Sequence, residues 1–513
     1  MPARRSRRSR RPRSRRQRQL SPLLKRPFQQ PVQRHAPYEL LGEDQVERIH
    51  EASMHILENV GLDFLDDEAL NIWERAGARV DRATQHVWLD RGLVMEAVAQ
   101  APAAFTWRAR NPQHNVRIGG DAVAFGPNGG MVYTSSLDRG RRPGAMADLE
   151  NFLKLSQMCN VLHFASWEQV APQDVPASTR HLHRLLAGFR LTDKAMMEAA
   201  HGRVITADCI EMARLVFGDL DGDPVIGDVI NVNSPLRYDD RMLGGLLTYA
   251  RAGQVTYITP FILAGAMSPV TIAAALAQQN AEVLAGVALT QLVNPGAPVM
   301  YGGFTTNIDM KSGSPSFGTP EGAWALFAGA QLARRYGLPS RGSGSLTSAN
   351  FPDAQAAYET MWTLWPAVQS HTHLIMHAVG WLESGLTASY EKFIIDAENL
   401  AMFHHFLQGF SLEDEDLALD MIAEVGPGGH HLGTPHTQAR YQTAFHQSSI
   451  ADRSSYDAWV DTGSQDAAQR ANRIWKELLK AYEPPALDPG IDEALADFVA
   501  RRERELEGQN LYE

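Results

Sequence analysis

Cysteine is nearly absent from this chain of 513 residues, which contains only Cys159 and Cys209. Two cysteines cannot form a disulfide framework, and they cannot supply the four thiolates of a structural zinc site. The sequence also lacks a GxxxxGK[ST] phosphate loop, and no glycine-rich dinucleotide fingerprint follows its first predicted barrel strand. These absences exclude a disulfide-rich secreted protein and give nucleotide binding no support, so we expect a cytoplasmic protein.

Acidic side chains are missing from residues 1–36, which carry 13 Lys and Arg residues, whereas the whole chain has a net charge of −11. The stretch from Met1 to Arg18 has almost nothing apolar, so it cannot bury enough surface to offset its ordering entropy. We therefore predict that residues 1–36 form a disordered, Arg-rich arm. Such an arm can bind RNA, a membrane or an acidic partner, but charge blocks of this kind are usually solvated tails, and we do not expect nucleic-acid binding.

Charged residues are also missing between Ala252 and Ala281, a stretch long enough to imitate a membrane span. Pro260, Gly265 and Pro269 divide it into a β-branched segment and an Ala-rich helical segment. A strand buried on both faces and followed by a helix is typical of a parallel sheet. We therefore assign this stretch to a protein core and expect no membrane partner.

From residue 160 to about 407 the sequence alternates between short apolar runs and amphipathic helices, which predicts an α/β fold built as a (β/α)8 TIM-type barrel. Seven strands are clear, and an eighth at Lys392–Ile395 is weak. The seven lie at Leu162–Trp167, Lys194–Glu198, Val229–Val232, Val255–Thr259, Pro298–Tyr301, Leu338–Gly342 and Thr372–Ala378. We predict an N-terminal helical and β-hairpin segment at 37–158, the barrel at 159–410 and a C-terminal helical extension at 411–513.

The functional groups of such a barrel lie where its strands end. Glu198 is the only carboxylate at the predicted strand ends, which disfavours a divalent-metal hydrolase. Arg341 is positioned there to hold a carboxylate by two hydrogen bonds. The histidines His371, His373 and His377 share a face in an extended segment, so a zinc-assisted methyltransferase or hydrolase remains an alternative. Aromatic side chains near the mouth, Tyr133 and Tyr301 among them, are suited to holding a cation that has no N–H donors.

Several ordered motifs then resemble the trimethylamine:corrinoid methyltransferase family, over residues 38–480. They are Phe125–Gly130 with Tyr133 and Asp138, Gly140–Pro143, Asp148-Leu149, Asp353–Glu359, Gly385–Phe393, Asp396–Glu398, and Val425–His430 through Leu432–Thr434 to His436-Thr437. The founding members use pyrrolysine, whereas this chain contains only the twenty ordinary residues. It therefore resembles the branch without pyrrolysine, whose members are associated with glycine betaine and related quaternary amines.

This resemblance implies a barrel that moves a methyl group from a quaternary amine, or from trimethylamine, to Co(I) of a corrinoid (cobalamin). A cognate corrinoid protein carries that cofactor, and the chain itself is expected to bind no cofactor or metal tightly. By their context, Tyr133 is expected to face the cation, Arg341 to clamp a carboxylate and His377 to donate a hydrogen bond. Tyr301, Asn233 and His373 complete the expected substrate site, and no residue is assigned as a catalytic acid or base. We also expect a homo-oligomer, and we keep a non-catalytic binder of methylated amines as an alternative.

Overall fold

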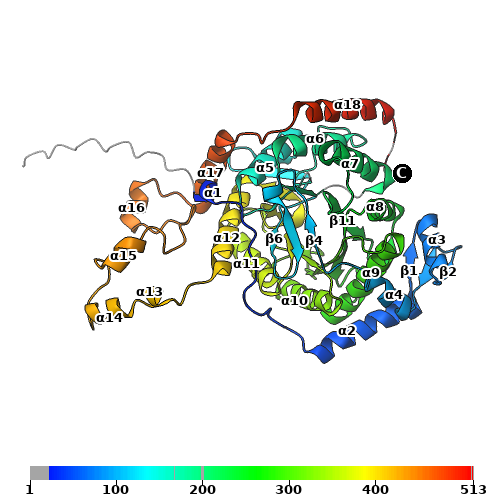
Figure 1. The fold of residues 1–513 in the computed structure, drawn as a ribbon, viewed down its shortest axis with the longest axis horizontal. Helices are drawn as coiled ribbons and strands as arrows, with labels where there is room; N and C mark the ends of the chain where they lie inside the picture. The colour runs from blue at the N-terminus through cyan, green and yellow to red at the C-terminus, as the bar shows by residue number, and fades with distance from the viewer. Residues whose placement is uncertain (1–21, 167, 198–200, 510, 512–513) are drawn as a thin grey trace, which may run out of the picture.

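The computed structural model describes residues 22–166, 168–197, 201–509 and 511. Parallel strands lie at its centre and helices surround them (Figure 1). Six strands form one continuous parallel ladder, in the order β11 (Gly227–Val232), β13 (Val255–Ala264), β14 (Val299–Gly302), β17 (Ser340–Ser343), β18 (Leu374–Met376) and β6 (Ala124–Phe125). Two further strands, β9 (Phe164–Ser166) and β10 (Ala195–Met197), form a separate parallel pair. The N–H of His163 donates to the carbonyl of Phe125, which links the entry of β9 to β6.

Long helices follow these strands, and a polar side chain caps the first turn of four of them. Asp239, Thr319, Asp353 and Ser389 each accept a hydrogen bond from a backbone N–H of the helix that they precede. The helices are α5 (Met146–Met158), α6 (Arg180–Leu191), α7 (Gly202–Phe217), α8 (Asp240–Arg251), α9 (Ile272–Val293), α10 (Pro320–Arg335), α11 (Ala354–Gln369) and α12 (Tyr390–Gln408).

The structure confirms the strand-then-helix interpretation of the uncharged stretch at 252–281, which forms β13 and the first part of α9. Helix α9 is long and apolar enough to cross a membrane, but 83% of its most apolar window is buried inside the protein. It is therefore a core helix, as predicted.

The seven clear strands are all found, whereas the eighth was wrongly placed. Lys392–Ile395 lies inside α12, where Lys392 forms a buried ion pair with Asp396 one helical turn later, at 2.7 Å. A short apolar run does not distinguish a buried helix from a strand. The missing partner of β18 is β6, which precedes the predicted start of the barrel at residue 159.

The N-terminal part forms a small four-stranded sheet, ordered β12-β1-β3-β2, and the predicted hairpin of β4 and β5.

Of the predicted arm, residues 1–21 lie outside the described residues. Residues 26–36, in contrast to the prediction, run along the body: Gln33 donates from its backbone to Asp121 and from its side chain to Val368. The elements are α1 (Pro22–Lys25), α2 (Glu43–His55), η1 (Ile56–Val60), β1 (Leu62–Phe64), α3 (Asp67–Arg75), β2 (Arg79–Asp81), β3 (His86–Trp88), α4 (Arg91–Val98), β4 (Ala104–Trp107), η2 (Pro112–His114), β5 (Val116–Gly119) and β12 (Arg237–Tyr238).

Shorter strands cover one end of the parallel ladder. β7 (Tyr133–Ser136), β8 (Gly140–Pro143), β19 (Trp381–Leu382) and β20 (Thr387–Ser389) form one sheet, with η3 (Glu383–Gly385) between the last two. β15 (Phe304–Ile308) pairs with the end of β13 and with β16 (Pro315–Ser316).

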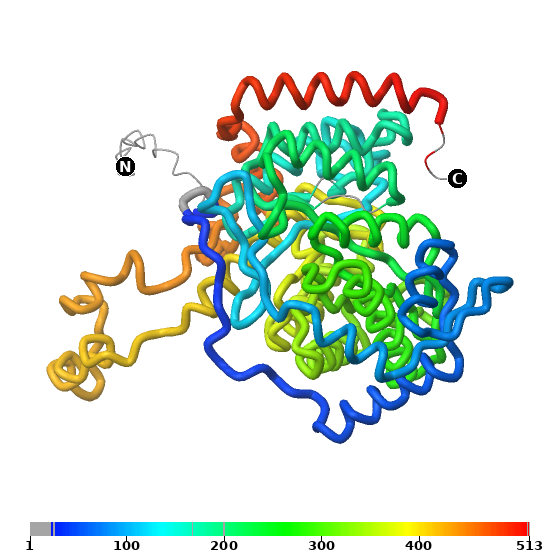
Figure 2. Tube along the Cα trace, turned by 45° about the vertical axis from the view of Figure 1, so that its right-hand side comes forward, coloured from blue at the N-terminus to red at the C-terminus, as the bar shows by residue number. Residues whose placement is uncertain are grey.

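The C-terminal helices behave in two ways. α17 (Ala467–Ala481) packs against α12, and α18 (Pro489–Glu505) lies across α6 and α7, where Arg502 pairs with Asp208 at 2.8 Å. In contrast, α13 (Asp414–Leu417), α14 (Leu419–Val425), α15 (Pro435–Arg440) and α16 (Tyr456–Asp461) project from the body in both views (Figures 1 and 2).

Candidate functional site

Arg341 lies on β17, beside Leu374 of β18, on the face of the ladder that packs around Tyr257, Met300 and Met376. It is only 4% exposed. Its Nε approaches the sulfur of Met376 at 3.4 Å, and its Nη1 donates to the carbonyl of Gly303 at 3.4 Å. Within the described chain no carboxylate forms an ion pair with it. Burial lowers the pKa of Arg341 to about 10, so it keeps its positive charge at neutral pH.

An aromatic cluster lies beside this guanidinium. The guanidinium carbon is 5.3 Å from the centre of the Phe304 ring. Phe304 stacks with His377 at 5.4 Å and with Phe317 at 5.7 Å, and Trp381 meets His377 edge-on at 4.8 Å. These rings form a largely apolar wall at the end of β18.

His377 is neutral in this setting. Burial, and then the charge of Arg341, hold the pKa of His377 well below its ordinary value. Its Nδ1 lies 3.1 Å from the hydroxyl of Ser343, on the neighbouring strand. A neutral imidazole offers one donor and one acceptor, so His377 can serve as a hydrogen-bonding group.

Two further carboxyl groups lie on or beside these parallel strands, Asp228 on β11 and Glu168 after β9. Tyr257 donates to Oδ1 of Asp228 at 2.9 Å, whereas Oδ2 has no partner in the part of the chain that the structure describes. Burial, and then the charge of Glu168, raise the pKa of Asp228 to about 8, so this carboxyl is largely protonated at neutral pH. When it is ionised, Asp228 raises the pKa of Arg341, so the two groups lie within electrostatic reach of each other.

Glu168 follows β9 and pairs with His201 at 3.2 Å. Burial alone would raise the pKa of Glu168, but the hydrogen bond and charge of His201 lower it. Burial alone would likewise lower the pKa of His201, but its bond to Glu168 raises it. This pair is therefore an ionised couple, and its carboxylate is the negative charge that acts on Asp228.

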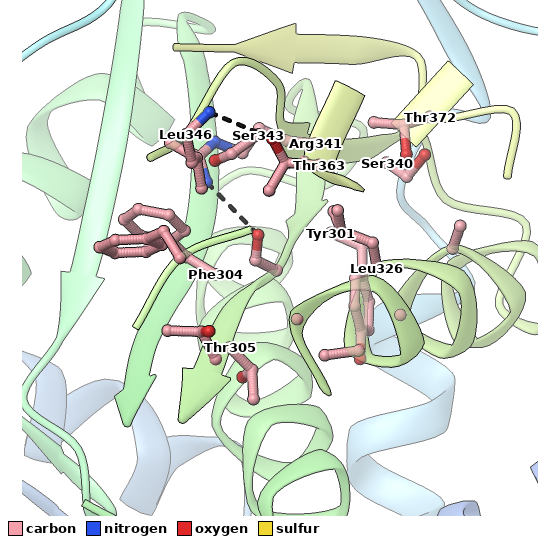
Figure 3. A pocket seen from close by; sticks show the side chains of 18 of the residues that line it. Tyr301, Phe304, Thr305, Leu326, Ser340, Arg341, Ser343, Leu346, Thr363 and Thr372 are labelled. Atoms are coloured by element: carbon pink, nitrogen blue, oxygen red, sulfur yellow. Dashed lines mark hydrogen bonds between the residues drawn. The ribbon is translucent and has the colours of Figure 1, made fainter. Parts of the chain in front are cut away.

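A small cavity, with a volume of about 30 Å³, borders Arg341 and Phe304 and extends between β14, β15 and β17 on one side and α10 on the other (Figure 3). Five glycines line it, and one of them, Gly303, connects β14 to β15. Two buried polar groups near β6 and β19 also lack partners among the described residues: both amide atoms of Asn128, and Nε1 of Trp381. A buried polar atom without a partner costs about 1–3 kcal/mol, so such atoms indicate where a ligand or water is bound.

The structure brings together two of the six predicted substrate residues, Arg341 and His377. Tyr301 borders the cavity, but its hydroxyl donates to Asn280 of α9 at 3.1 Å. His373 precedes β18, at the opposite end of that strand from His377, and bonds to Ser340 and to the carbonyl of Gly120.

The other two predicted residues contact the protein itself. Asn233 is exposed and accepts a hydrogen bond from the backbone of Asp239. The ring of Tyr133 does face a cation, but that cation is Arg141 at 3.6 Å, which is paired with Glu383. Glu198 lies outside the described residues. Among the residues that are described, no group of three His, Cys, Asp or Glu side chains is close enough to hold a metal ion.

Comparison with known proteins decides the family. The family model described as trimethylamine methyltransferase (MTTB) matches residues 4–507. The chain belongs to this family. The predicted resemblance is thereby confirmed, as is the prediction of an amine methyltransferase.

Members of the trimethylamine methyltransferase family resemble the chain over almost its whole length. The glycine betaine methyltransferase of Desulfitobacterium hafniense strain Y51 is 42% identical over 91% of this chain and 98% of its own. The trimethylamine methyltransferase MttB of D. hafniense strain DCB-2 is 32% identical over 90% and 94%. MttB2 of Methanosarcina mazei is 29% identical over 91% and 95%.

Proposed function

We propose that this methyltransferase takes a methyl group from a quaternary amine that carries a carboxylate, of the glycine betaine class, and delivers it to Co(I) of a corrinoid on a separate protein. The observation that carries the proposal is Arg341, a buried guanidinium with no carboxylate partner within the described chain. A buried charge without a counter-ion is strongly destabilising, and a substrate carboxylate supplies that counter-ion. The 42% identity to a protein named for glycine betaine, against 32% for one named for trimethylamine, supports the same choice.

The chemistry explains why no acid or base is assigned. The nucleophilic Co(I) supplies the electron pair of the new cobalt–carbon bond. The N–CH₃ bond breaks with its electron pair left on nitrogen, so the leaving group is a neutral tertiary amine that needs no proton. The protein must therefore remove water from the cation and align one N–CH₃ bond.

The residues of the site divide these tasks. Arg341 binds the carboxylate, and His377 and the amide of Asn128 are placed to add hydrogen bonds. The faces of Phe304 and Trp381 hold the ammonium, at about 0.5–2 kcal/mol for each ring. Glu168 supplies a negative charge near the site, and Asp228, which is protonated in the free protein, becomes negatively charged when the bound ammonium favours its ionised form.

We further propose that the ladder and the β9–β10 pair together form a closed (β/α)8 barrel, drawn from about residue 122 to 408. The site then lies at the carboxyl end of the strands, where a corrinoid protein can approach. The chain acts in this view as a cytoplasmic enzyme, and the methylated amine and the corrinoid protein are its two substrates.

Titration calorimetry tests the substrate class. Glycine betaine should bind, and choline, which has the same trimethylammonium group but no carboxylate, should bind at least tenfold more weakly. Equal affinities would contradict a carboxylate clamp. Metal analysis of the active protein separates the zinc alternative, which requires stoichiometric zinc.

A further inference from the structure

Residues 409–445 form an arm that leaves the body at the end of α12 and returns to it. The carbonyl of Gln408 accepts from Arg34 at the start of the arm. At its end, Glu398 of α12 accepts from the ring of His446 at 2.8 Å and from the backbone of Ser449 at 2.9 Å. Figures 1 and 2 both show the segment between these anchors extending away from the body.

The arm exposes apolar side chains that its own body does not cover. None of its residues is buried, and Phe410 and Phe445 are 88% and 78% exposed. Its other large exposed apolar residues are Leu412, Leu417, Leu419, Ile422, Leu432 and Tyr441. Helices α13, α14 and α15 have four, seven and six residues. Helices this short are not stable alone in water, so the arm needs a surface to pack against.

Helix α14 shows which of its faces would pack. Leu419 and Ile422 are one turn apart and share a face, whereas Asp420 and Glu424 share another. An amphipathic helix of this pattern is suited to an apolar groove, with its acidic face left in water.

The same chain has an uncovered apolar groove on α10 and α11. Its lining contains no charged residue. The lining residues are Tyr38, Leu40, Ala323, Trp324, Phe327, Tyr358, Met361, Trp362, Trp365, Pro366 and Gln369. Trp362 is 50% exposed, and Trp324 and Tyr358 are similarly open. No residue of the arm lines this groove. Exposed apolar patches of this kind mark interaction surfaces.

We propose that the arm of one copy of the chain packs its α14 face into the α10–α11 groove of a second copy, and that the second copy returns the same contact. Each copy carries one uncovered arm and one uncovered groove, so a reciprocal exchange between two copies covers both and closes the assembly. Burying these apolar side chains removes them from water, which favours association. The inference does not depend on the substrate proposed above.

Light scattering on the full chain tests the exchange. The protein should have at least twice the mass of the 56.7-kDa chain. Ile422→Asp, in the arm, and Trp362→Asp, in the groove, should each shift it to the monomer, whereas Asp420→Ala, on the opposite face of α14, should not. A monomeric parent protein, or association that needs an added corrinoid protein, would overturn the proposal.

Mixing the two disrupted variants separates an arm–groove contact from a groove–groove contact. The Ile422→Asp chain keeps its groove and the Trp362→Asp chain keeps its arm, so the mixture should regain a dimer through one intact contact. Failure of the mixture to associate, while each variant keeps the parent's circular dichroism, would overturn the exchange.

If either aspartate variant does not fold, a disulfide replaces it as the test. Cys159 and Cys209 are both buried, so cysteines placed at Ile422 and Tyr358 supply the exposed thiols. The Ile422→Cys/Tyr358→Cys chain should form a disulfide between two chains, and Asp420→Cys/Tyr358→Cys should form much less. Equal cross-linking of the two, or a disulfide within one chain, would contradict the contact.

Discussion

Replacing Arg341 with methionine should weaken glycine betaine binding and stabilise the ligand-free protein at the same time. The guanidinium is buried, and its bonds are to a sulfur and a carbonyl, both at 3.4 Å. A hydrogen bond to a charged group contributes about 1.5–3 kcal/mol, so losing the carboxylate contact should raise the Kd by roughly 10- to 150-fold. Replacing an uncompensated buried charge with an apolar side chain of similar size should raise the unfolding free energy by about 1–4 kcal/mol.

Calorimetry and denaturant unfolding of the same preparation measure both effects. Choline is the matched control ligand, because it lacks the carboxylate and should lose little affinity in the variant. An unchanged Kd for glycine betaine would refute the clamp. A parallel loss for betaine and choline would show that the substitution had damaged the pocket as a whole.

Four further predictions concern the site and its supports. Burial raises the pKa of Asp228 to about 8, and a bound ammonium favours the ionised carboxylate. The affinity for glycine betaine should therefore rise as the pH increases through 8. Asp228→Asn should make the affinity nearly independent of pH over this range. A carboxyl whose pKa is higher in the folded state than in the unfolded state destabilises the protein as the pH rises from about 4 to 8. The unfolding free energy of Asp228→Asn, measured in urea, should therefore increase relative to that of the parent protein over this pH range. A constant difference between the two free energies would contradict this prediction. Phe304→Ala should weaken betaine and choline binding alike, by about 1–2 kcal/mol in calorimetry, whereas Tyr133→Ala should not, since Tyr133 does not line the cavity beside Arg341; equal losses would restore Tyr133 to the site. Asp396→Ala should lower the free energy of unfolding by about 3–5 kcal/mol in denaturant, because it leaves Lys392 charged and buried without its partner. A decrease of less than about 1 kcal/mol would refute that pairing.

Much of the fold could be predicted from the sequence because its strands are short, apolar and separated by long helices. The single misplaced strand shows the limit of that signal. Ala124–Phe125 is too short to have a period, whereas Phe393 and Ile394 are apolar because they face the core from a helix. Only the pairing of β6 with β18 distinguishes the two.

The site was harder to predict because a strand-end position does not fix the direction of a side chain. Arg341 and His377 point toward the same cluster, but Tyr301 faces α9 and His373 lies at the other end of its strand. Asp228 was missed because the predicted strand began one residue later, at Val229, and so did not include this carboxyl. Glu168 directly follows the predicted strand Leu162–Trp167, so a closer count of strand-end carboxylates would have found it.

The most direct test of the central claim is a product measurement. The protein is incubated with glycine betaine and a corrinoid protein reduced to Co(I), and the tertiary amine and the methylated corrinoid are both quantified. The account predicts equal amounts of dimethylglycine and methylated corrinoid, and no comparable reaction with trimethylamine. Demethylation of trimethylamine, with glycine betaine left intact, would contradict it.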